Sequence, residues 1–155
     1  MESIIRPADQ TDAEAISAVI VSALRETNAN DYSREIIARV EKSFGPDAMR
    51  KLIENRTVFV ATRNGEIVGT ASLDGKVVRT VFVAPALHGH GIGKQLMNHV
   101  EQIARTQSIA ILTVPSSVTA ESFYAKLGFV AVRDSYHGEE RTIIMERDLE
   151  LSRKS

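Results

Sequence analysis

One segment constrains the fold of this chain more than any other. Residues 81–96, VFVAPALHGHGIGKQL, run from an apolar strand through a proline turn into three glycines and then into a helix. Gly89, Gly91 and Gly93 remove side chains where a backbone must approach a ligand closely. The helix that follows offers unpaired N–H groups and the positive end of its dipole. The segment therefore predicts an anion-binding loop, for which a diphosphate is a natural ligand.

Two common glycine motifs do not fit this loop. A dinucleotide-binding G-x-G-x-x-G pattern would place Lys94 or Leu96 at its third glycine, and the Gly-Lys-Ser or Gly-Lys-Thr of a P-loop does not occur in the chain. What remains is His88-x-x-Gly91-x-Gly93. This pattern resembles the cofactor loop of the GNAT superfamily, the acetyl-CoA-dependent N-acetyltransferases, in which Gln or Arg stands where this chain has His88. Taken alone, the loop is also consistent with a glycine-rich turn that has no function.

Length and composition limit the classes of protein that the chain can represent. Its 155 residues fit one domain, residues 1–155, and 43% hydrophobic and 25% charged residues are ordinary values for a globular protein. No apolar run approaches the ~20 residues that span a bilayer. With 19 basic and 20 acidic residues the net charge is −1, which gives no general attraction to nucleic acid. We expect no membrane and no nucleic-acid partner. The absence of cysteine and of a secretory signal at the N-terminus predicts a cytoplasmic location.

The first half of the chain changes from helical to strand periodicity near residue 57. A short strand at 4–5 precedes three helical segments, of which the last covers 46–54. From residue 57 the period is two, and the dipeptides Asn64-Gly65 and Asp74-Gly75 predict two hairpin turns between three antiparallel strands. The third of these strands leads into the glycine loop.

The second half alternates helices and strands. A helix from 92 to about 107 is followed by an apolar strand at 109–114, which suits burial on both faces and which Pro115 should end. A helix ending at 127 comes next, and the last strands, 129–133 and 141–146, are joined by a polar loop that contains Tyr136 and His137. The predicted order is β-α-α-α-β-β-β-α-β-α-β-β, an α+β fold. This is also the GNAT order, so the resemblance implies a mixed, mostly antiparallel central sheet flanked by helices.

A second motif supports the resemblance. Residues 121–129, ESFYAKLGF, are similar to the Phe-Tyr-x-x-Leu-Gly-Phe signature that closes a helix in the same family. Phe123, Leu127 and Phe129 have the spacing of core residues. For Tyr124 the resemblance implies a hydroxyl near the sulfur of coenzyme A, which makes it the candidate catalytic residue, with a merely packed tyrosine as the alternative.

The resemblance implies acetyl-CoA as cosubstrate. In the family the third strand of the meander and the strand from 109 splay apart, which leaves backbone groups of the third strand free for the cofactor. His88 and His90 either contact an anion or are simply exposed. Ser117, where many relatives have Asn, either bonds the cofactor or caps a helix. The implied cofactor-binding residues are Val81, Phe82, Val83, His88, Gly89, His90, Gly91, Ile92, Gly93, Lys94, Ser117 and Tyr124.

The sequence does not name a general base. An alkylamine is mostly protonated at pH 7, so its proton must be accepted before it attacks a thioester. Many relatives carry a Glu on the strand before the loop, whereas residues 76–80 read KVVRT, and Asp74 is assigned to the hairpin turn. His99 and His137 are predicted to be surface residues. No His, Cys or carboxylate cluster has metal-ligand spacing, so no metal is expected.

The acceptor is predicted to be a primary amine of a small molecule or peptide, bound between residues 27–44 and 135–138. Asp31, Tyr32 and Glu35 could hold a cationic amine there, and a solvated helix end is the alternative reading of the same residues. A non-catalytic acyl-CoA sensor or scaffold domain is the alternative function, motivated by the missing carboxylate. Similar proteins often use their last two strands for dimer contacts, so a homodimer is one option.

Overall fold

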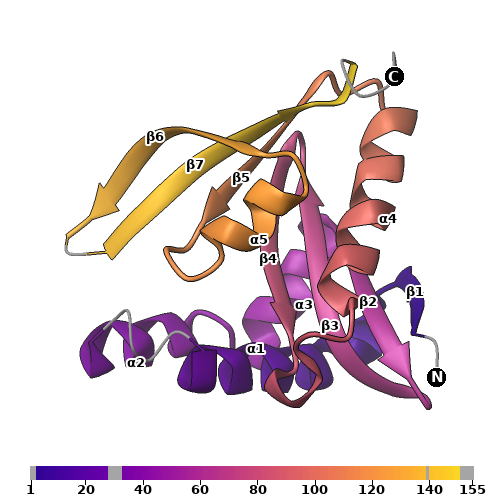
Figure 1. Cartoon of the computed structure of the whole chain (residues 1–155). Coiled ribbons are helices and arrows are strands. Elements are labelled where there is room, and N and C mark those ends of the chain that lie inside the picture. Colours follow the sequence, from indigo (N-terminus) through magenta and orange to yellow (C-terminus); the bar gives the residue numbers. More distant parts are fainter. Residues whose placement is uncertain (1–2, 28–32, 139, 151–155) are drawn as a thin grey trace.

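The computed structural model describes residues 3–27, 33–138 and 140–150, which form one sheet with helices on both faces (Figure 1). Two short 3-10 helices, η1 (Gln10–Asp12) and η2 (Pro85–Leu87), precede α1 and α4. The order of helices and strands is the predicted one. The helices are α1 (Ala13–Thr27), α2 (Arg34–Lys42), α3 (Pro46–Asn55), α4 (Ile92–Thr106) and α5 (Glu121–Lys126), and the strands are β1 (Ile4–Pro7), β2 (Thr57–Arg63), β3 (Glu66–Asp74), β4 (Val77–Val83), β5 (Ile111–Ser116), β6 (Val130–His137) and β7 (Glu140–Asp148).

The sheet has seven strands in the order β1-β2-β3-β4-β5-β7-β6. Every neighbouring pair is antiparallel except β4 and β5, which are parallel. The mixed, mostly antiparallel sheet is therefore confirmed. In Figure 1, α4 and α5 lie in front of the sheet and α3 lies behind it, so the two faces are covered by different helices.

Alternation along β2 divides the core into two clusters. Phe59 and Ala61 pack with α4 on one face, whereas Val58 and Val60 pack with α1 and α3 on the other. A strand whose successive side chains are all buried in this way must lie between two layers of helices. The first cluster includes Leu96, Val100, Leu112, Met145 and Tyr124, and the second includes Ile16, Ile20, Leu24 and Met49.

The two meander turns form at the predicted places, with one difference in register. Asn64 and Gly65 have φ values of 57° and 80° and make the first two-residue turn. In the second hairpin Asp74 pairs with Val77, so the turn residues are Gly75 and Lys76. Gly75, at φ 61°, occupies the first turn position, which is where a type II′ turn requires glycine.

Pro115 does not end its strand, contrary to the prediction. β5 begins later than expected and runs through Pro115 to Ser116, with Pro115 paired to Ile144 of β7. Thr113 directs its N–H toward β4, where it donates to the carbonyl of Lys76 at 3.0 Å. Pro115, two residues further on, faces the same edge, so the N–H that proline lacks is not needed by β7. Leu112, Val114 and Ser116 are buried while Ile111 is exposed, so β5 is fully buried on one face rather than on both.

The last hairpin is longer than predicted. β6 continues through Tyr136 and His137, which the sequence had placed in a loop, and only residues 138 and 139 separate β6 from β7. Ser135 pairs with Thr142, and Tyr136 pairs with Arg141. Gly138, at φ 63°, supplies the left-handed conformation that so short a connection requires.

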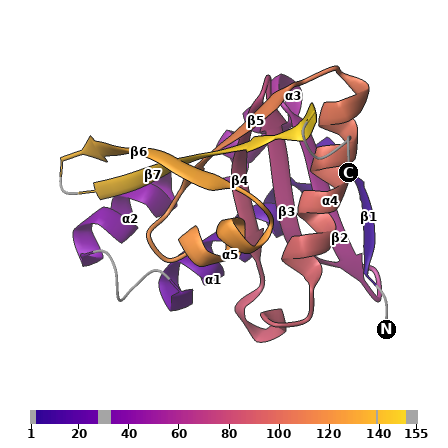
Figure 2. The same cartoon turned by 45° about the horizontal axis from the view of Figure 1, so that its top comes forward.

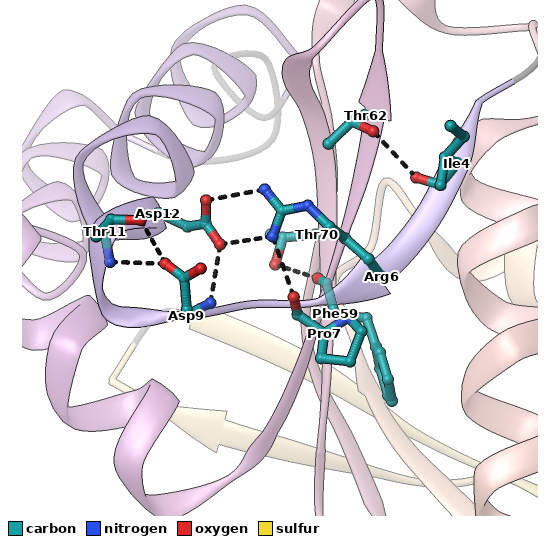
Figure 3. Close-up of polar contacts among 9 residues, drawn as sticks. All are labelled: Ile4, Arg6, Pro7, Asp9, Thr11, Asp12, Phe59, Thr62 and Thr70. Carbon is teal, nitrogen blue, oxygen red and sulfur yellow. Dashed lines mark hydrogen bonds and ion pairs between the residues drawn. The ribbon is translucent and has the colours of Figure 1, made fainter.

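The N-terminal end of α1 is fixed by a polar cluster (Figure 3). Arg6 of β1 donates two hydrogen bonds, of 2.9 and 3.0 Å, to the carboxylate of Asp12. That carboxylate also accepts the N–H of Asp9 at 2.8 Å, while Asp9 accepts the N–H of Thr11, so the two acidic residues form a reciprocal capping box. On β3, the buried hydroxyl of Thr70 donates to the carbonyl of Phe59 at 2.9 Å. The cluster joins the edge strand of the sheet to the first helix.

Replacing Asp12 with asparagine should lower the free energy of unfolding by about 1–2 kcal/mol at pH 7, because a part-buried guanidinium contact loses its charged partner. The hydrogen bonds from Arg6 lower the pKa of Asp12 below its usual value. The stabilisation is therefore fully present above the ordinary aspartate pKa of about 4 and is lost as the pH falls through the lowered pKa. Urea unfolding of both proteins at pH 7 and near pH 3.5 measures this difference.

Asp47→Asn is the matched control, since Asp47 is 95% exposed and pairs with Arg50 at the surface. We expect it to change the free energy of unfolding by less than about 0.5 kcal/mol. Equal effects of the two substitutions would contradict the role given to Asp12.

Candidate functional site

The parallel strands β4 and β5 separate almost as soon as they meet. Their register consists of one pair, Val77 with Thr113, next to the hydrogen bond from Thr113 to Lys76. Beyond this pair β5 runs away from β4 and stays paired with β7, as both views show (Figures 1 and 2). The rest of β4 therefore has a strand partner on its β3 side alone.

A β-bulge in β4 lies close to this point. Arg79 pairs with Ser72 and Phe82 pairs with Thr70, so three steps along β4 match two steps along β3. The extra residue brings Thr80 to a φ of 58°. A β-branched residue rarely adopts this left-handed conformation, at a cost of about 1–3 kcal/mol, so neighbouring contacts must hold it. Arg56 does so by donating to the Thr80 hydroxyl at 3.3 Å.

The bulge is followed by the three β4 residues that the sequence predicted to bind the cofactor. Val81 and Val83 pack toward the cluster around α4, while Phe82 points to the other face and meets the ring of Phe44 at 5.9 Å. The N–H of Ala84 donates to Val68 of β3 at 2.8 Å. Since successive residues direct their N–H groups to opposite edges, the N–H of Val83 is directed to the edge that β5 has left.

The glycine loop continues from this strand end. Gly89 and Gly91 have φ values of 85° and 79°, and a Cβ added to either would meet no atom within 4 Å. Gly91 is the N-cap of α4 and provides no side-chain hydrogen bond. The first N–H groups of the 15-residue helix therefore remain available, beside open space, for an anion.

Gly93 has a different role from the other two glycines. A Cβ at this position would lie 3.1 Å from Cζ of Phe123 on α5. The sequence predicts a ligand beside Gly93, and this stays a prediction; in the structure its missing side chain makes room for an aromatic ring. This contact brings the start of α4, and so the loop, against α5.

The two loop histidines and Lys94 are exposed, and Ile92 is buried beneath them. Nε2 of His88 donates to the carbonyl of Val83 at 3.0 Å, so the imidazole ties the loop back to the end of β4. This contact is a third use of His88, different from the anion contact and from the simple exposure considered for the sequence.

Tyr124 lies at the centre of the aromatic group on α5. Its ring meets Phe123 and Phe129 edge to face, with ring centroids 5.0 and 5.7 Å away, and the residue is only 5% exposed. Burial raises the pKa of its hydroxyl well above the ordinary value for tyrosine. The group therefore keeps its proton at neutral pH and can donate a hydrogen bond. Within the described residues this hydroxyl has no hydrogen-bond partner.

Ser117 binds the turn that leads into α5, whose N-cap is Ala120. Its Oγ accepts the N–H of Ala120 at 3.2 Å, and its carbonyl accepts the Ser116 hydroxyl at 2.8 Å. Ser117 therefore makes a capping-type contact within this turn and not at the N-cap of α5 itself. A hydroxyl that accepts one bond can still donate another, so the capping contact leaves room for a ligand.

Of the three predicted acceptor residues, the structure describes one. Asp31 and Tyr32 lie outside the described residues, and Glu35 is exposed in the first turn of α2. His99, predicted to be a surface residue, is half-buried, and its ring meets Phe59 edge to face at 4.6 Å. The side chain of His137 lies outside the description.

Sequence reasoning missed the polar residues behind the bulge. Arg56, Asp74 and Arg79 meet there, and Asp74 forms ion pairs with both arginines besides ending a strand at the turn. The absence of a carboxylate from residues 76–80, KVVRT, is visible in the sequence. It shows which type of residue this strand lacks, but it does not predict the cluster of arginines and aspartate. The left-handed Thr80 has no signature in the sequence.

Two further properties concern the described part of the chain as a whole. None of its helices combines the length and the apolar character needed to cross a membrane. Its residues also contain no group of three or more His, Cys, Asp or Glu that could hold a metal ion.

Comparisons with known proteins identify the fold that carries this diverging strand pair, bulged β4 and open helix N-terminus. The model of the acetyltransferase (GNAT) domain matches residues 28–145, so the chain belongs to the GNAT acetyltransferase family and is an acyltransferase. An uncharacterised N-acetyltransferase of Escherichia coli (strain K12), YafP, is 26% identical over 132 residues, which are 83% of this chain and 82% of that protein.

Solved structures share the fold over nearly the whole chain. A GCN5-related N-acetyltransferase from Rhodopseudomonas palustris has a TM-score of 0.89 at 27% identity and covers 96% of both chains. The PaiA N-acetyltransferase of Thermoplasma acidophilum, crystallised with coenzyme A, has a TM-score of 0.83 at 21% identity and covers 96% of this chain and 99% of its own.

Gly93→Ala should lower the free energy of unfolding by about 1–3 kcal/mol, because the added methyl overlaps Phe123. Gly91→Ala introduces left-handed strain of about 1–2 kcal/mol without any overlap. Phe123→Leu should therefore relieve the first variant and not the second. Urea unfolding of the single and double variants gives the coupling energies. Equal coupling of Phe123 to both glycines would contradict the packing role of Gly93.

Proposed function

We propose that this enzyme transfers the acetyl group of acetyl-CoA to a primary amine of a small molecule or peptide, by direct attack of the amine within a ternary complex. The observation that carries the proposal is the divergence of β4 from β5 between the open N-terminus of α4 and the buried Tyr124. Family membership supports the same activity, as does the coenzyme A bound to the structurally similar PaiA protein.

The loop and the first turn of α4 would hold the diphosphate of coenzyme A. Gly89 and Gly91 leave the backbone open to solvent, and the first helical N–H groups lack a side-chain cap. Their partial positive charge favours a diphosphate there. Lys94 is exposed beside the loop and adds a positive charge, and the exposed His90 adds an imidazole that can donate a hydrogen bond. The open cradle fits the proposed ligand.

The outer edge of β4 would hold the pantetheine arm and polarise the thioester. The N–H groups of Val81 and Val83 and the C=O of Val81 need partners once β5 has left, whereas the C=O of Val83 already accepts from His88. An amide-rich arm pairs with such an edge as an additional strand does. One N–H directed at the thioester oxygen stabilises the charge that develops there by about 3 kcal/mol.

Tyr124 would stabilise the departing sulfur. Acetyl-CoA supplies an activated acetyl group whose leaving group is a thiolate, with a conjugate acid that titrates near 8.5. Because burial raises the pKa of Tyr124, complete proton transfer to the sulfur is unfavourable, whereas hydrogen-bond donation remains available. The Tyr124 hydroxyl therefore acts as a hydrogen-bond donor, and the proton released by the amine is what protonates the thiolate.

Two measurements test the function directly. Acetyl-CoA at 100 µM should raise the melting temperature by mass action, and a panel of primary amines should release coenzyme A from it. A thiol reagent detects that release without background, because the chain contains no cysteine. Acetyl-CoA binding without release by any amine would favour a sensor instead, and the absence of any shift would contradict the cofactor site.

Tyr124→Phe should lower kcat at least tenfold while leaving the affinity for acetyl-CoA nearly unchanged, because only the transition state needs the hydroxyl. Coenzyme A release gives kcat, and titration of the melting temperature gives the affinity. The ring packing with Phe123 and Phe129 is retained, so the melting temperature of the free protein is the control for folding. An unchanged kcat would remove Tyr124 from the mechanism.

A further inference from the structure

Two arginines share one carboxylate behind the bulge of β4. Nε of Arg79 lies 3.3 Å from Oδ2 of Asp74, and Nε of Arg56, the C-cap of α3, lies 3.9 Å from the same oxygen. Two guanidinium charges against one carboxylate leave a net charge of +1 in this cluster. Lys76, exposed in the adjacent turn, adds a further positive charge.

The cluster has fewer hydrogen-bond acceptors than donors. Nε of Arg79 is buried and forms no hydrogen bond within the described residues, since its contact with Asp74 is an ion pair without hydrogen-bond geometry. Burial lowers the pKa of Arg56, and repulsion from Arg79 lowers it further against the opposing effect of Asp74. Glu146 of β7 forms no ion pair with Arg79 in the part of the chain that the structure describes. An added anion would relieve this excess of positive charge.

Arg79 stands beside the place where the strands part. It is two residues beyond the single β4–β5 pair, which is about 7 Å along a strand, and it precedes the left-handed Thr80. Its partner in the register, Ser72, lines a small cavity against α1 and α3, so Arg79 lies on the face opposite α4. The Arg79 side chain is 42% exposed, so a ligand can reach it. The proposed diphosphate site is at the other side of the sheet.

We propose that Arg79, oriented by Asp74, binds a carboxylate of the acceptor, so that the acceptor is an amine that also carries a carboxylate. This inference rests on the proposed acetyl transfer and names its substrate class. The guanidinium pairs with a carboxylate through two parallel hydrogen bonds. The same positive charge disfavours the protonated form of a nearby amine. A larger fraction of the bound amine is then unprotonated and able to attack the thioester. This matters because β4 has no carboxylate that could accept the proton of the amine.

The test compares three ω-amino acids with their carboxamides: glycine, β-alanine and 4-aminobutyrate against glycinamide, β-alaninamide and 4-aminobutanamide. Each pair has nearly the same shape and differs in the negative charge. The carboxamide also lowers the pKa of its own amine, so the comparison is biased against the proposal. In at least one pair the wild-type enzyme should use the acid at least tenfold better, as kcat/KM for coenzyme A release.

Arg79→Gln should reduce that preference to less than about threefold, because the acid loses its binding partner and is slowed more than the amide. Arg63→Gln, at the β2–β3 turn, is the matched control and should keep the preference. Equal use of acid and amide by the wild type, or an unchanged preference in Arg79→Gln, would overturn the inference while acetyl transfer itself stands. If Arg79→Gln does not fold, Asp74→Asn replaces it. That variant weakens the contact that orients Arg79, so the preference should fall, and an unchanged preference would overturn the inference.

A binding measurement separates this inference from the proposed function. With coenzyme A present, at least one of the three acids at 10 mM should raise the melting temperature of the wild type more than its amide does, and Arg79→Gln should abolish the difference. If no amine supports turnover, the proposed acetyl transfer fails, but this shift still reports carboxylate binding. Identical shifts with acid and amide would overturn the carboxylate site.

Discussion

The candidate site depends on the place where β4 and β5 stop pairing. The hydrogen bond from Thr113 to Lys76 joins the two strands into one sheet, and beyond it each strand has an unpaired edge. An edge that opens inside a covered fold leaves backbone N–H and C=O groups without strand partners, which is costly unless something else bonds them. The sequence is adapted to the opening on both sides. Pro115 faces it from β5 with no N–H to satisfy, and the bulge at Thr80 turns β4 away. Permanent pairing of the two strands would need neither feature, so the opening is built into the chain.

Much of the fold follows from local signals. Asn64 with Gly65 specifies a hairpin by its backbone preferences, and the segment from Val81 to Gly93 has one plausible reading as strand, loop and helix. The errors arose where tertiary context decides. Pro115 ends a strand only if its N–H side needs a partner, and whether it does depends on where β4 goes. The polar residues up to His137 look like a loop, yet they pair because β7 is long enough to receive them.

The site was predictable to the extent that its residues are contiguous. The glycine loop and Tyr124 come from short motifs, and the structure connects them through Gly93, whose missing side chain accommodates Phe123. Sequence alone could not separate this packing glycine from Gly89 and Gly91, because the distinction lies in what each would touch. The cluster of Arg56, Asp74 and Arg79 draws on three separate elements, so no local pattern could bring its members together.

The missing base and the excess of positive charge are two aspects of one arrangement. A carboxylate on β4 would favour the ammonium form of an acceptor and then remove its proton. An arginine on the same strand instead disfavours the ammonium form when the acceptor arrives, so less remains to be removed. That arrangement works only if the acceptor brings a negative charge of its own, since a simple cation would be repelled before it could bind. The charge on β4 therefore acts on both the reactivity of the amine and the choice of acceptor, and Asp74, by fixing Arg79 without neutralising the pair of arginines, keeps both effects in place.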